Sequence, residues 1–163
     1  RGKRAGTENI PAIVGMAATL KDVLAHQEEN AAKMTALRDR LIDGLLTIPH
    51  SKLNGDRTKR LPGNVNFCFE GIEGESLLLM LDMKGIAASS GSACTSGSLD
   101  PSHVLLAIGL PHEIAHGSLR LTLSEKTTME EIDYTVDKLK AIIERLRSMS
   151  PLYEDFVRKN KEE

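Results

Sequence analysis

The sequence predicts an α+β fold, in which a small, mainly antiparallel sheet has helices packed on one side. Several long segments repeat apolar residues at helical spacing, whereas only a few short segments alternate as strands do. These segments do not follow one another as the regular strand–helix–strand series of a parallel sheet. A length of 163 residues also suffices for one compact domain with a substantial core.

Composition narrows the classes of function. The chain has 21 basic and 23 acidic residues and no basic stripe interleaved with aromatic residues, so nucleic acid is not an expected partner. It has no apolar run of bilayer-spanning length and no signal peptide, which favours a soluble, cytoplasmic protein without membrane contact. Two cysteines do not form a disulfide framework, so both are expected to be free thiols. Because the first residue is not methionine, we expect the chain to be a fragment.

The first third of the chain predicts two helices, or one long helix with a bend. Apolar residues recur at helical spacing within residues 13–24 and again within residues 34–45. Residues 26–30 are polar and interrupt the two patterns. The interruption marks the boundary or the bend.

The start of the first helix carries its own signals. Thr7 and Asn9 are candidate N-caps, and Pro11 suits a first turn. A helix N-terminus beside a hydroxyl also suits an anionic group, although spacing alone favours a plain N-cap at Thr7. Along the two helical patterns, Met16 and Met34 are expected in the core.

The middle of the chain predicts a loop and then a strand. Residues 50–60 are polar and positively charged, and we expect a solvated loop there. Residues 64–69 alternate as a strand, which places one valine and two phenylalanines on one face. Cys68 points to the other face of this ordered element, so it is predicted to be a small buried hydrophobic residue.

Residues 77–83 predict a short, very apolar helix with Gly85 as its C-cap. A strand is expected at residues 86–89. Asp100 is then a predicted N-cap for a helix that begins at Pro101 and ends at Gly109. These short elements frame a loop that carries the second cysteine.

A strand over residues 118–123 follows, with its three leucines on the core face. Arg120 therefore shares the opposite face with Ser118 and Thr122. An arginine on a strand is usually a solvated edge charge. Its guanidinium group is also the side chain best suited to bind a carboxylate in bidentate fashion.

The last third of the chain predicts two more helices. Residues 128–131 form a capping box, and a long amphipathic helix follows and is broken at Pro151. Residues 152–157 predict a final short helix. Tyr153 and Phe156 are expected to be packing residues there.

The stretch of residues 86–98 opens as a short apolar strand and then contains only small residues around Cys94. With no large side chain to bury, it is expected to form an exposed loop. An exposed thiol is reactive, so we interpret Cys94 as functional. His103 and His112 lack the spacing of a metal site and are interpreted as surface histidines.

Four stretches carry a family resemblance. Residues 1–7 read Arg-Gly-Lys-Arg-Ala-Gly-Thr, and residues 89–95 read Ser-Ser-Gly-Ser-Ala-Cys-Thr. Residues 99–102 read Leu-Asp-Pro-Ser, and residues 115–123 read Ala-His-Gly-Ser-Leu-Arg-Leu-Thr-Leu. In this order they resemble motifs of cysteine desulfurases of the NifS/IscS type, within the class-V aminotransferases of pyridoxal-phosphate fold type I. The resemblance covers nearly all of this chain, but only the C-terminal portion of the family's chain.

The resemblance implies a domain organisation. Residues 1–24 would end the large cofactor domain and supply a connecting helix. Residues 25–163 would form the small C-terminal domain, which carries the catalytic cysteine loop at 86–99. The implied reaction moves sulfur from L-cysteine to an enzyme cysteine as a persulfide, releasing L-alanine, for iron–sulfur cluster assembly and other acceptors.

Residue roles follow from the matched motifs. The resemblance makes Cys94 the nucleophile and gives Arg120 the substrate carboxylate. His116 would assist substrate binding or proton transfer, or make a structural hydrogen bond. Thr7 would reach the phosphate of pyridoxal 5'-phosphate in the neighbouring subunit of a homodimer. Cys94 would also be a transient iron–sulfur ligand, the one metal-binding role implied, shared with a scaffold protein of the IscU/NifU type.

One departure from the family pattern limits the expected activity. The family's cofactor lysine follows a histidine, and no His-Lys pair occurs in this chain. We therefore expect the chain alone to be inactive and to need the N-terminal portion of the enzyme. A partner protein in tRNA thiolation is another implied sulfur acceptor. The alternatives are a sulfur-carrier or interaction module without catalysis, and a selenocysteine lyase.

Overall fold

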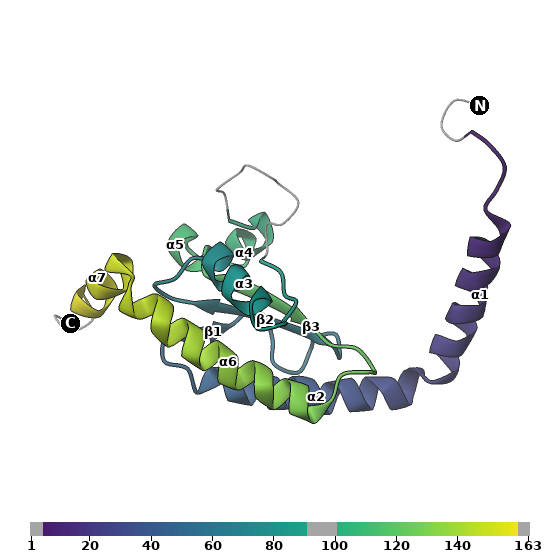
Figure 1. Ribbon diagram of the computed structural model, residues 1–163, viewed down its shortest axis with the longest axis horizontal. Coiled ribbons are helices and arrows are strands. Elements are labelled where there is room, and N and C mark those ends of the chain that lie inside the picture. The colour runs from purple at the N-terminus through teal and green to yellow at the C-terminus, as the bar shows by residue number, and fades with distance from the viewer. Residues whose placement is uncertain (1–4, 91–100, 160–163) are drawn as a thin grey trace.

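A computed structural model of the protein describes residues 5–90 and 101–159 (Figure 1). Three strands and three groups of helices follow one another irregularly along the described residues, as the α+β prediction requires. The elements in chain order are α1 (Ile10–Ala25), α2 (Gln27–Leu46), β1 (Ser51–Leu53), β2 (Asn64–Phe69), α3 (Gly74–Asp82), α4 (His103–Ala107), α5 (His112–Ala115), β3 (Ser118–Thr122), α6 (Met129–Ser148) and α7 (Pro151–Lys159).

The sheet has the order β1-β2-β3, and both pairings are antiparallel. In the β2–β3 register, Asn66 lies opposite Arg120 and Phe67 lies opposite Leu119. On the free edge of β3, Ser89 forms one further antiparallel bridge with Arg120. The strand expected at residues 86–89 is thus reduced to a single bridging residue.

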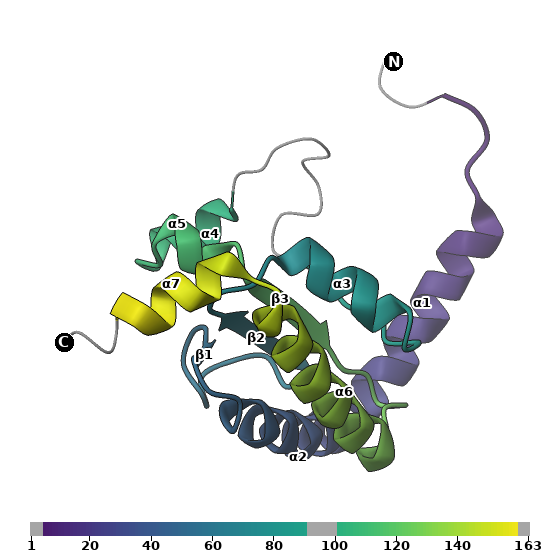
Figure 2. The same ribbon diagram turned by 60° about the vertical axis from the view of Figure 1, so that its left-hand side comes forward.

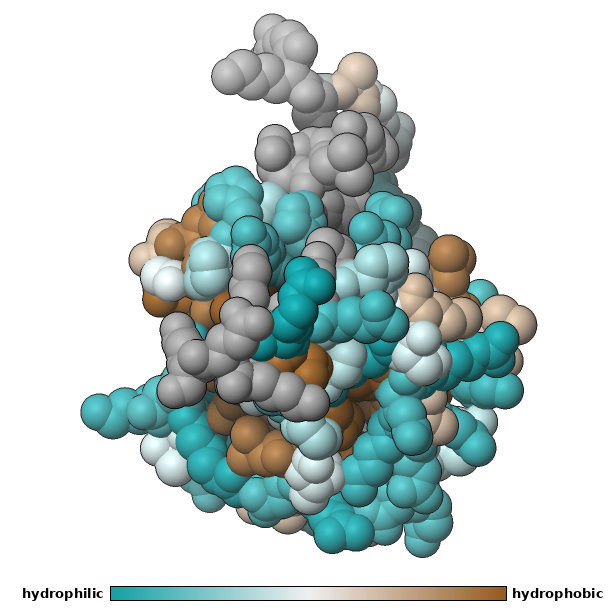
Figure 3. All heavy atoms as spheres, turned by 90° about the vertical axis from the view of Figure 1, so that its left-hand side faces the viewer, coloured by the Kyte–Doolittle hydropathy of each residue, from teal (hydrophilic) through white to brown (hydrophobic). Residues whose placement is uncertain are grey.

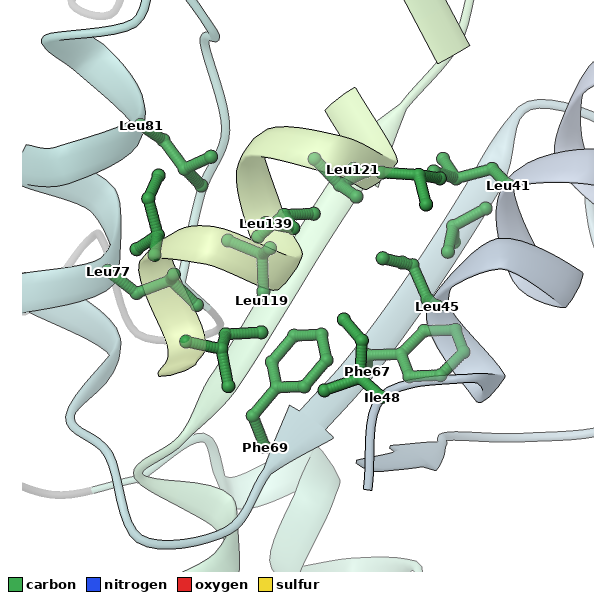
Figure 4. Close-up of a cluster of buried hydrophobic side chains, with 14 of the residues drawn as sticks. Leu41, Leu45, Ile48, Phe67, Phe69, Leu77, Leu81, Leu119, Leu121 and Leu139 are labelled. Carbon is green, nitrogen blue, oxygen red and sulfur yellow. The ribbon is translucent and has the colours of Figure 1, made fainter. Parts of the chain in front are cut away.

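The core lies between one face of the sheet and the helices α2, α3 and α6. Val65, Phe67 and Phe69 all point into it, as their alternation predicts, and side chains from five elements converge there (Figure 4). The opposite face is partly covered as well, because Cys68 packs with Leu105 of the α4 region. The predicted small antiparallel sheet with helices on one side is confirmed, and the short helices α4 and α5 are an addition on the other side.

Helix α1 projects away from this body (Figures 1 and 2), and none of its residues is buried. The prediction that Met16 is a core residue is wrong, because its side chain is 70% exposed. Met34 on α2 is half-buried. The prediction of a helix here is confirmed, but no other described element covers the apolar side chains of α1.

Local signals set most helix ends where the sequence predicts them. The Asn9 side chain accepts a hydrogen bond from Ala12 N at 3.1 Å and caps α1. Thr128 and Glu131 form the predicted capping box at the start of α6. Gly85 closes α3 with a positive φ of 72°, which a residue without a Cβ adopts at little cost.

Two predicted elements differ from the structure. The loop expected at residues 50–60 contains β1, which pairs with β2 at the edge of the sheet. The helix expected from Pro101 begins only at His103, with Ser102 at its N-cap position, while the predicted cap Asp100 lies outside the described residues. Both elements have fewer than six residues, too few for a hydrophobic period to reveal their bounds.

Candidate functional site

Arg120 is an exposed, charged residue on the sheet face opposite the core. It lies in the middle of β3 between the buried Leu119 and Leu121, and this alternation turns its own side chain outward. The residue is exposed, and within the described chain its guanidinium group makes no hydrogen bond or ion pair. An unengaged guanidinium on a rigid strand suits a carboxylate or another planar anion.

The segment that leads to Cys94 starts directly beside Arg120. Ser89 N donates to Arg120 O at 3.1 Å, and Arg120 N donates to Ser89 O at 2.6 Å. Cys94 itself lies outside the described residues, five positions after Ser89.

His116 follows α5 and is exposed, four positions before Arg120. Its carbonyl accepts a hydrogen bond from Gly74 N at 3.0 Å, which joins the start of α3 to the turn before β3. Its imidazole ring makes no hydrogen bond to any described residue. The predicted role of the ring in substrate binding therefore stays a prediction.

The turn after His116 has no room for a side chain at residue 117, which is a glycine. A Cβ at this position would collide with the carbonyl oxygen of Phe69, and it would lie 3.2 Å from the carbonyl oxygen of Ile72. Gly117 O accepts a hydrogen bond from Phe69 N at 2.9 Å, so the two backbones are in direct contact. This close approach places β3, and Arg120 with it, against β2.

Thr7 lies two residues before the cap of α1 and is exposed. The backbone N–H groups at the start of this helix are already engaged: Ile10 N with Glu8 O, Ala12 N with the Asn9 side chain, and Ile13 N with Asn9 O. The helix end is therefore a capped terminus without free donors. The structure does not bring Thr7 to Arg120 within one chain, because α1 extends away from the sheet (Figures 1 and 2).

Two asparagines on the same sheet face as Arg120 were not singled out from the sequence. Asn54, 7% exposed, donates from Nδ2 to Asn66 Oδ1 at 2.6 Å and to Cys68 Sγ at 3.2 Å. Asn66 is half-buried and lies opposite Arg120 in the sheet register. The strand alternation that placed Cys68 away from the core puts Asn66 on the same face, but only the register of β2 against β3 places it opposite Arg120.

Cys68 is fully buried, as predicted for a small hydrophobic residue in an ordered strand. Burial raises the pKa of its thiol, and the hydrogen bond from Asn54 opposes that shift only in part. A buried thiol with a raised pKa is a poor nucleophile. Cys68 does not compete with Cys94 for the reactive role.

The other surfaces of the described residues show no comparable arrangement of functional side chains. An open hollow between α2 and α6 is lined by charged side chains, among them Arg40 and Asp133, which form an ion pair at 2.9 Å. Seen from the end where α5 and α7 lie, the surface is mostly hydrophilic with small hydrophobic areas (Figure 3). Residues 5–90 and 101–159 hold no cluster of three metal-ligating side chains, and neither His103 nor His112 forms part of one. None of the helices in these ranges is long and apolar enough to cross a membrane.

The chain is similar to cysteine desulfurases along its whole length. The IscS desulfurase of Clostridium botulinum is 58% identical over 166 residues, which cover 100% of this chain and 42% of that protein. The IscS of Methanosarcina thermophila is 56% identical over 152 residues, or 93% of this chain and 38% of the relative. The chain thus spans less than half the length of these curated relatives.

Solved structures support the same grouping. A NifS-like protein matches with a TM-score of 0.76 and 32% identity, over 90% of this chain and 36% of its own. A NifS-like protein from Rickettsia africae matches with a TM-score of 0.77 and 27% identity, over 86% of this chain and 36% of its own. The family description "Aminotransferase class-V" matches residues 2–135. The chain therefore belongs to the class-V aminotransferase family.

Proposed function

We propose that the chain is part of a pyridoxal-phosphate-dependent cysteine desulfurase, in which Arg120 binds the carboxylate of L-cysteine and Cys94 receives the sulfur. The observation that carries the proposal is the pair of backbone hydrogen bonds between Ser89 and Arg120. It joins an unengaged guanidinium group to the start of the segment that bears Cys94. A protein that only carries sulfur has no use for a carboxylate clamp at this place.

The reaction assigns one covalent step to this chain. The Cys94 thiolate attacks the sulfur atom of the bound substrate, a new S–S bond forms, and the C–S bond of L-cysteine breaks. With a proton added at the substrate carbon, L-cysteine and the Cys94 thiol become L-alanine and the Cys94 persulfide, so the atoms balance. Pyridoxal phosphate, when bound, supplies the electron sink that this bond cleavage requires.

The described residues fit only one edge of that cofactor. Thr7 offers a hydroxyl group for its phosphate, but the adjacent helix end has no free backbone donor to add. The family's histidine–lysine anchor does not occur in the sequence. The remainder of the full-length protein would therefore hold the cofactor, and Thr7 would contact the phosphate.

The placement of α1 supports a division at its end. Residues 1–24 would belong with the cofactor domain, and residues 25–163 would form the small domain around the sheet. Helix α1 has no buried residue and exposes its large apolar side chains. Such a helix is stabilised when another apolar surface covers it, and the cofactor domain of the same protein is the proposed cover. Thr7 would then serve the partner subunit of a homodimer, since it cannot reach Arg120 of its own chain.

The sulfur of the Cys94 persulfide would pass to acceptor proteins in the cytoplasm. An iron–sulfur scaffold protein of the IscU/NifU type is the first proposed acceptor, with Cys94 as a transient ligand of the cluster it builds. A partner protein in tRNA thiolation is a second proposed acceptor. Both acceptors are proposed from the resemblance of the matched motifs alone.

The test uses the full-length enzyme with bound cofactor. It is given L-cysteine, and alanine release and protein-bound sulfane sulfur are measured together. The expected result is that Cys94→Ser abolishes both, while Cys68→Ala, which alters the buried thiol, retains both. Retained alanine release in Cys94→Ser, or its absence from the unaltered enzyme, would overturn the proposal.

A further inference from the structure

Four polar residues form a row across the sheet face that carries Arg120. Asn54 N donates to Asn66 O at 2.9 Å, Asn66 lies opposite Arg120, and Arg120 bridges to Ser89. All four lie on the face opposite the hydrophobic core. In an antiparallel pair, side chains directly opposite each other have Cβ atoms about 5 Å apart. Asn66 is therefore the side chain of β2 nearest the base of Arg120.

The amide group of Asn66 is held in one orientation. Its Oδ1 accepts a hydrogen bond of 2.6 Å from Nδ2 of Asn54, which is buried behind it. Because the oxygen and nitrogen of an amide diverge from one carbon, Nδ2 of Asn66 lies on the side away from Asn54. That nitrogen has no hydrogen-bond partner within residues 5–90 and 101–159, so its two N–H donors are available at the strand position opposite Arg120.

The only net charge on the four residues of the row is positive. The only ionised side chain of the row is the Arg120 guanidinium, and the free donors of Asn66 add partial positive charge next to it. No carboxylate of a described residue pairs with either group. Neighbouring donors that no described carboxylate engages favour an external anion with more than one oxygen.

We infer that Asn66 is a second binding residue for the substrate carboxylate, with Asn54 as the residue that positions it; this inference rests on the proposed function. Arg120 supplies the charge and Asn66 supplies a neutral donor to the same carboxylate. Asn54 acts only through Asn66. The two strands then define the carboxylate position from both sides, and an amine or amide without that negative group is excluded.

The experiment compares two ligands of the full-length, cofactor-loaded enzyme by titration calorimetry. L-Alanine carries the carboxylate without the reactive sulfur, and L-alaninamide has nearly the same shape without the negative charge. A hydrogen bond to a charged group contributes enough free energy that Asn66→Ala is expected to weaken L-alanine binding about tenfold. L-Alaninamide binding is expected to change by less than about twofold.

Asn66→Asp is the sharper variant, because it keeps the shape of the side chain and can still accept the hydrogen bond from Asn54. The aspartate would repel the carboxylate of L-alanine, so that binding weakens more than in Asn66→Ala. The amide nitrogen of L-alaninamide can instead donate to the new carboxylate, so its binding is retained or improved. A purely structural role for Asn66 would change the two ligands equally.

Asn64→Ala is the matched control, since Asn64 lies on the same strand face, two residues earlier and opposite Thr122. It is expected to leave both ligands unchanged. Asn54→Ala is expected to lower the preference for L-alanine over L-alaninamide, by less than Asn66→Ala does. The inference is overturned if Asn66→Ala behaves as Asn64→Ala does while Arg120→Ala loses L-alanine selectively. If Arg120→Ala also leaves that preference unchanged, the proposed role of Arg120 fails instead.

Discussion

Ser89 and Arg120 exchange two backbone hydrogen bonds, of 3.1 and 2.6 Å, on the free edge of β3. The bridge fixes Ser89 to the strand that carries the guanidinium group. In the proposed enzyme, one end of the cysteine tether is anchored at the substrate site.

Arg120→Ala in the full-length enzyme is expected to raise the KM for L-cysteine about 100-fold, because two charge-assisted hydrogen bonds to the carboxylate are lost. Arg120→Lys is expected to recover only part of this loss, since lysine keeps the charge without the fork of donors. Alanine formation measured against substrate concentration checks both. Lys52→Ala removes another exposed cation of the same sheet face and should leave KM unchanged. An equal effect of Lys52→Ala would show that only the overall charge of the face matters.

Prediction from the sequence succeeded where the hydrophobic periodicity and the residue types indicate the same placement. Alternation placed Arg120 and Cys68 on the sheet face opposite the core, and the capping signals set the start of α6. The prediction failed for β1, because three residues carry no period, and for Met16, because helical spacing does not show what covers a helix. Asn66 was overlooked because an asparagine in a strand has no distinctive pattern. Only the register of β2 against β3 shows that it lies beside Arg120.

The buried thiol of Cys68 makes stability depend on pH. Its folded pKa is raised by burial, whereas the thiol of the unfolded chain ionises near pH ~8.5. Above that pH the unfolded state releases the proton first, so the free energy of unfolding falls until the raised folded pKa is passed. Denaturant unfolding of the Cys94→Ser chain from neutral to alkaline pH measures this fall.

The control for that measurement is the double variant Cys94→Ser/Cys68→Ala, which keeps every other titrating group. Its baseline stability is lower because a buried sulfur atom is removed, so only the pH slopes are compared. The slope above pH ~8.5 is expected to be shallower in the double variant. Identical slopes would mean that the Cys68 thiol does not titrate differently in the folded and unfolded chain.

Arg147 ties the end of α6 to the turn before β1. Although only 7% exposed, it donates to Glu70 O at 3.0 Å, Pro49 O at 2.7 Å and His50 O at 3.0 Å. The guanidinium carbon of Arg147 also lies 4.7 Å from the ring centroid of Tyr153. His50, whose carbonyl accepts one of these hydrogen bonds, has a positive φ of 53°. Tyr153 is thus a packing residue, as predicted.

Arg147→Ala is expected to lower the free energy of unfolding by about 3 kcal/mol or more, because three carbonyl groups lose a charged donor. Arg145→Ala is the matched control, since Arg145 is an exposed arginine on the same helix and should change stability by less than about 0.5 kcal/mol. Urea unfolding of the two variants gives both values. Equal stabilities would mean that the three hydrogen bonds contribute no net free energy.

Gly44 marks the place where α2 crosses α6. A Cβ added there would lie 2.6 and 2.9 Å from the two Cγ atoms of Val136, a branched side chain that cannot turn aside. Gly44→Ala is therefore expected to destabilise the fold by about 1–3 kcal/mol, measured by denaturant unfolding. Gly15→Ala is the matched change, because Gly15 lies within helix α1 with nothing within 4 Å of the added Cβ.

Gly15→Ala should instead increase the helical signal in far-ultraviolet circular dichroism, since alanine favours a helix interior by roughly 0.5–1 kcal/mol over glycine. The collision at Gly44 is tested further by the pair Gly44→Ala/Val136→Ala, in which the shorter side chain leaves room for the new methyl group. The pair should be more stable than the sum of the two single changes implies, because the methyl group fills part of the space that Val136 vacates. Strict additivity would show that Gly44→Ala acts through the helix backbone and not through its contact with Val136.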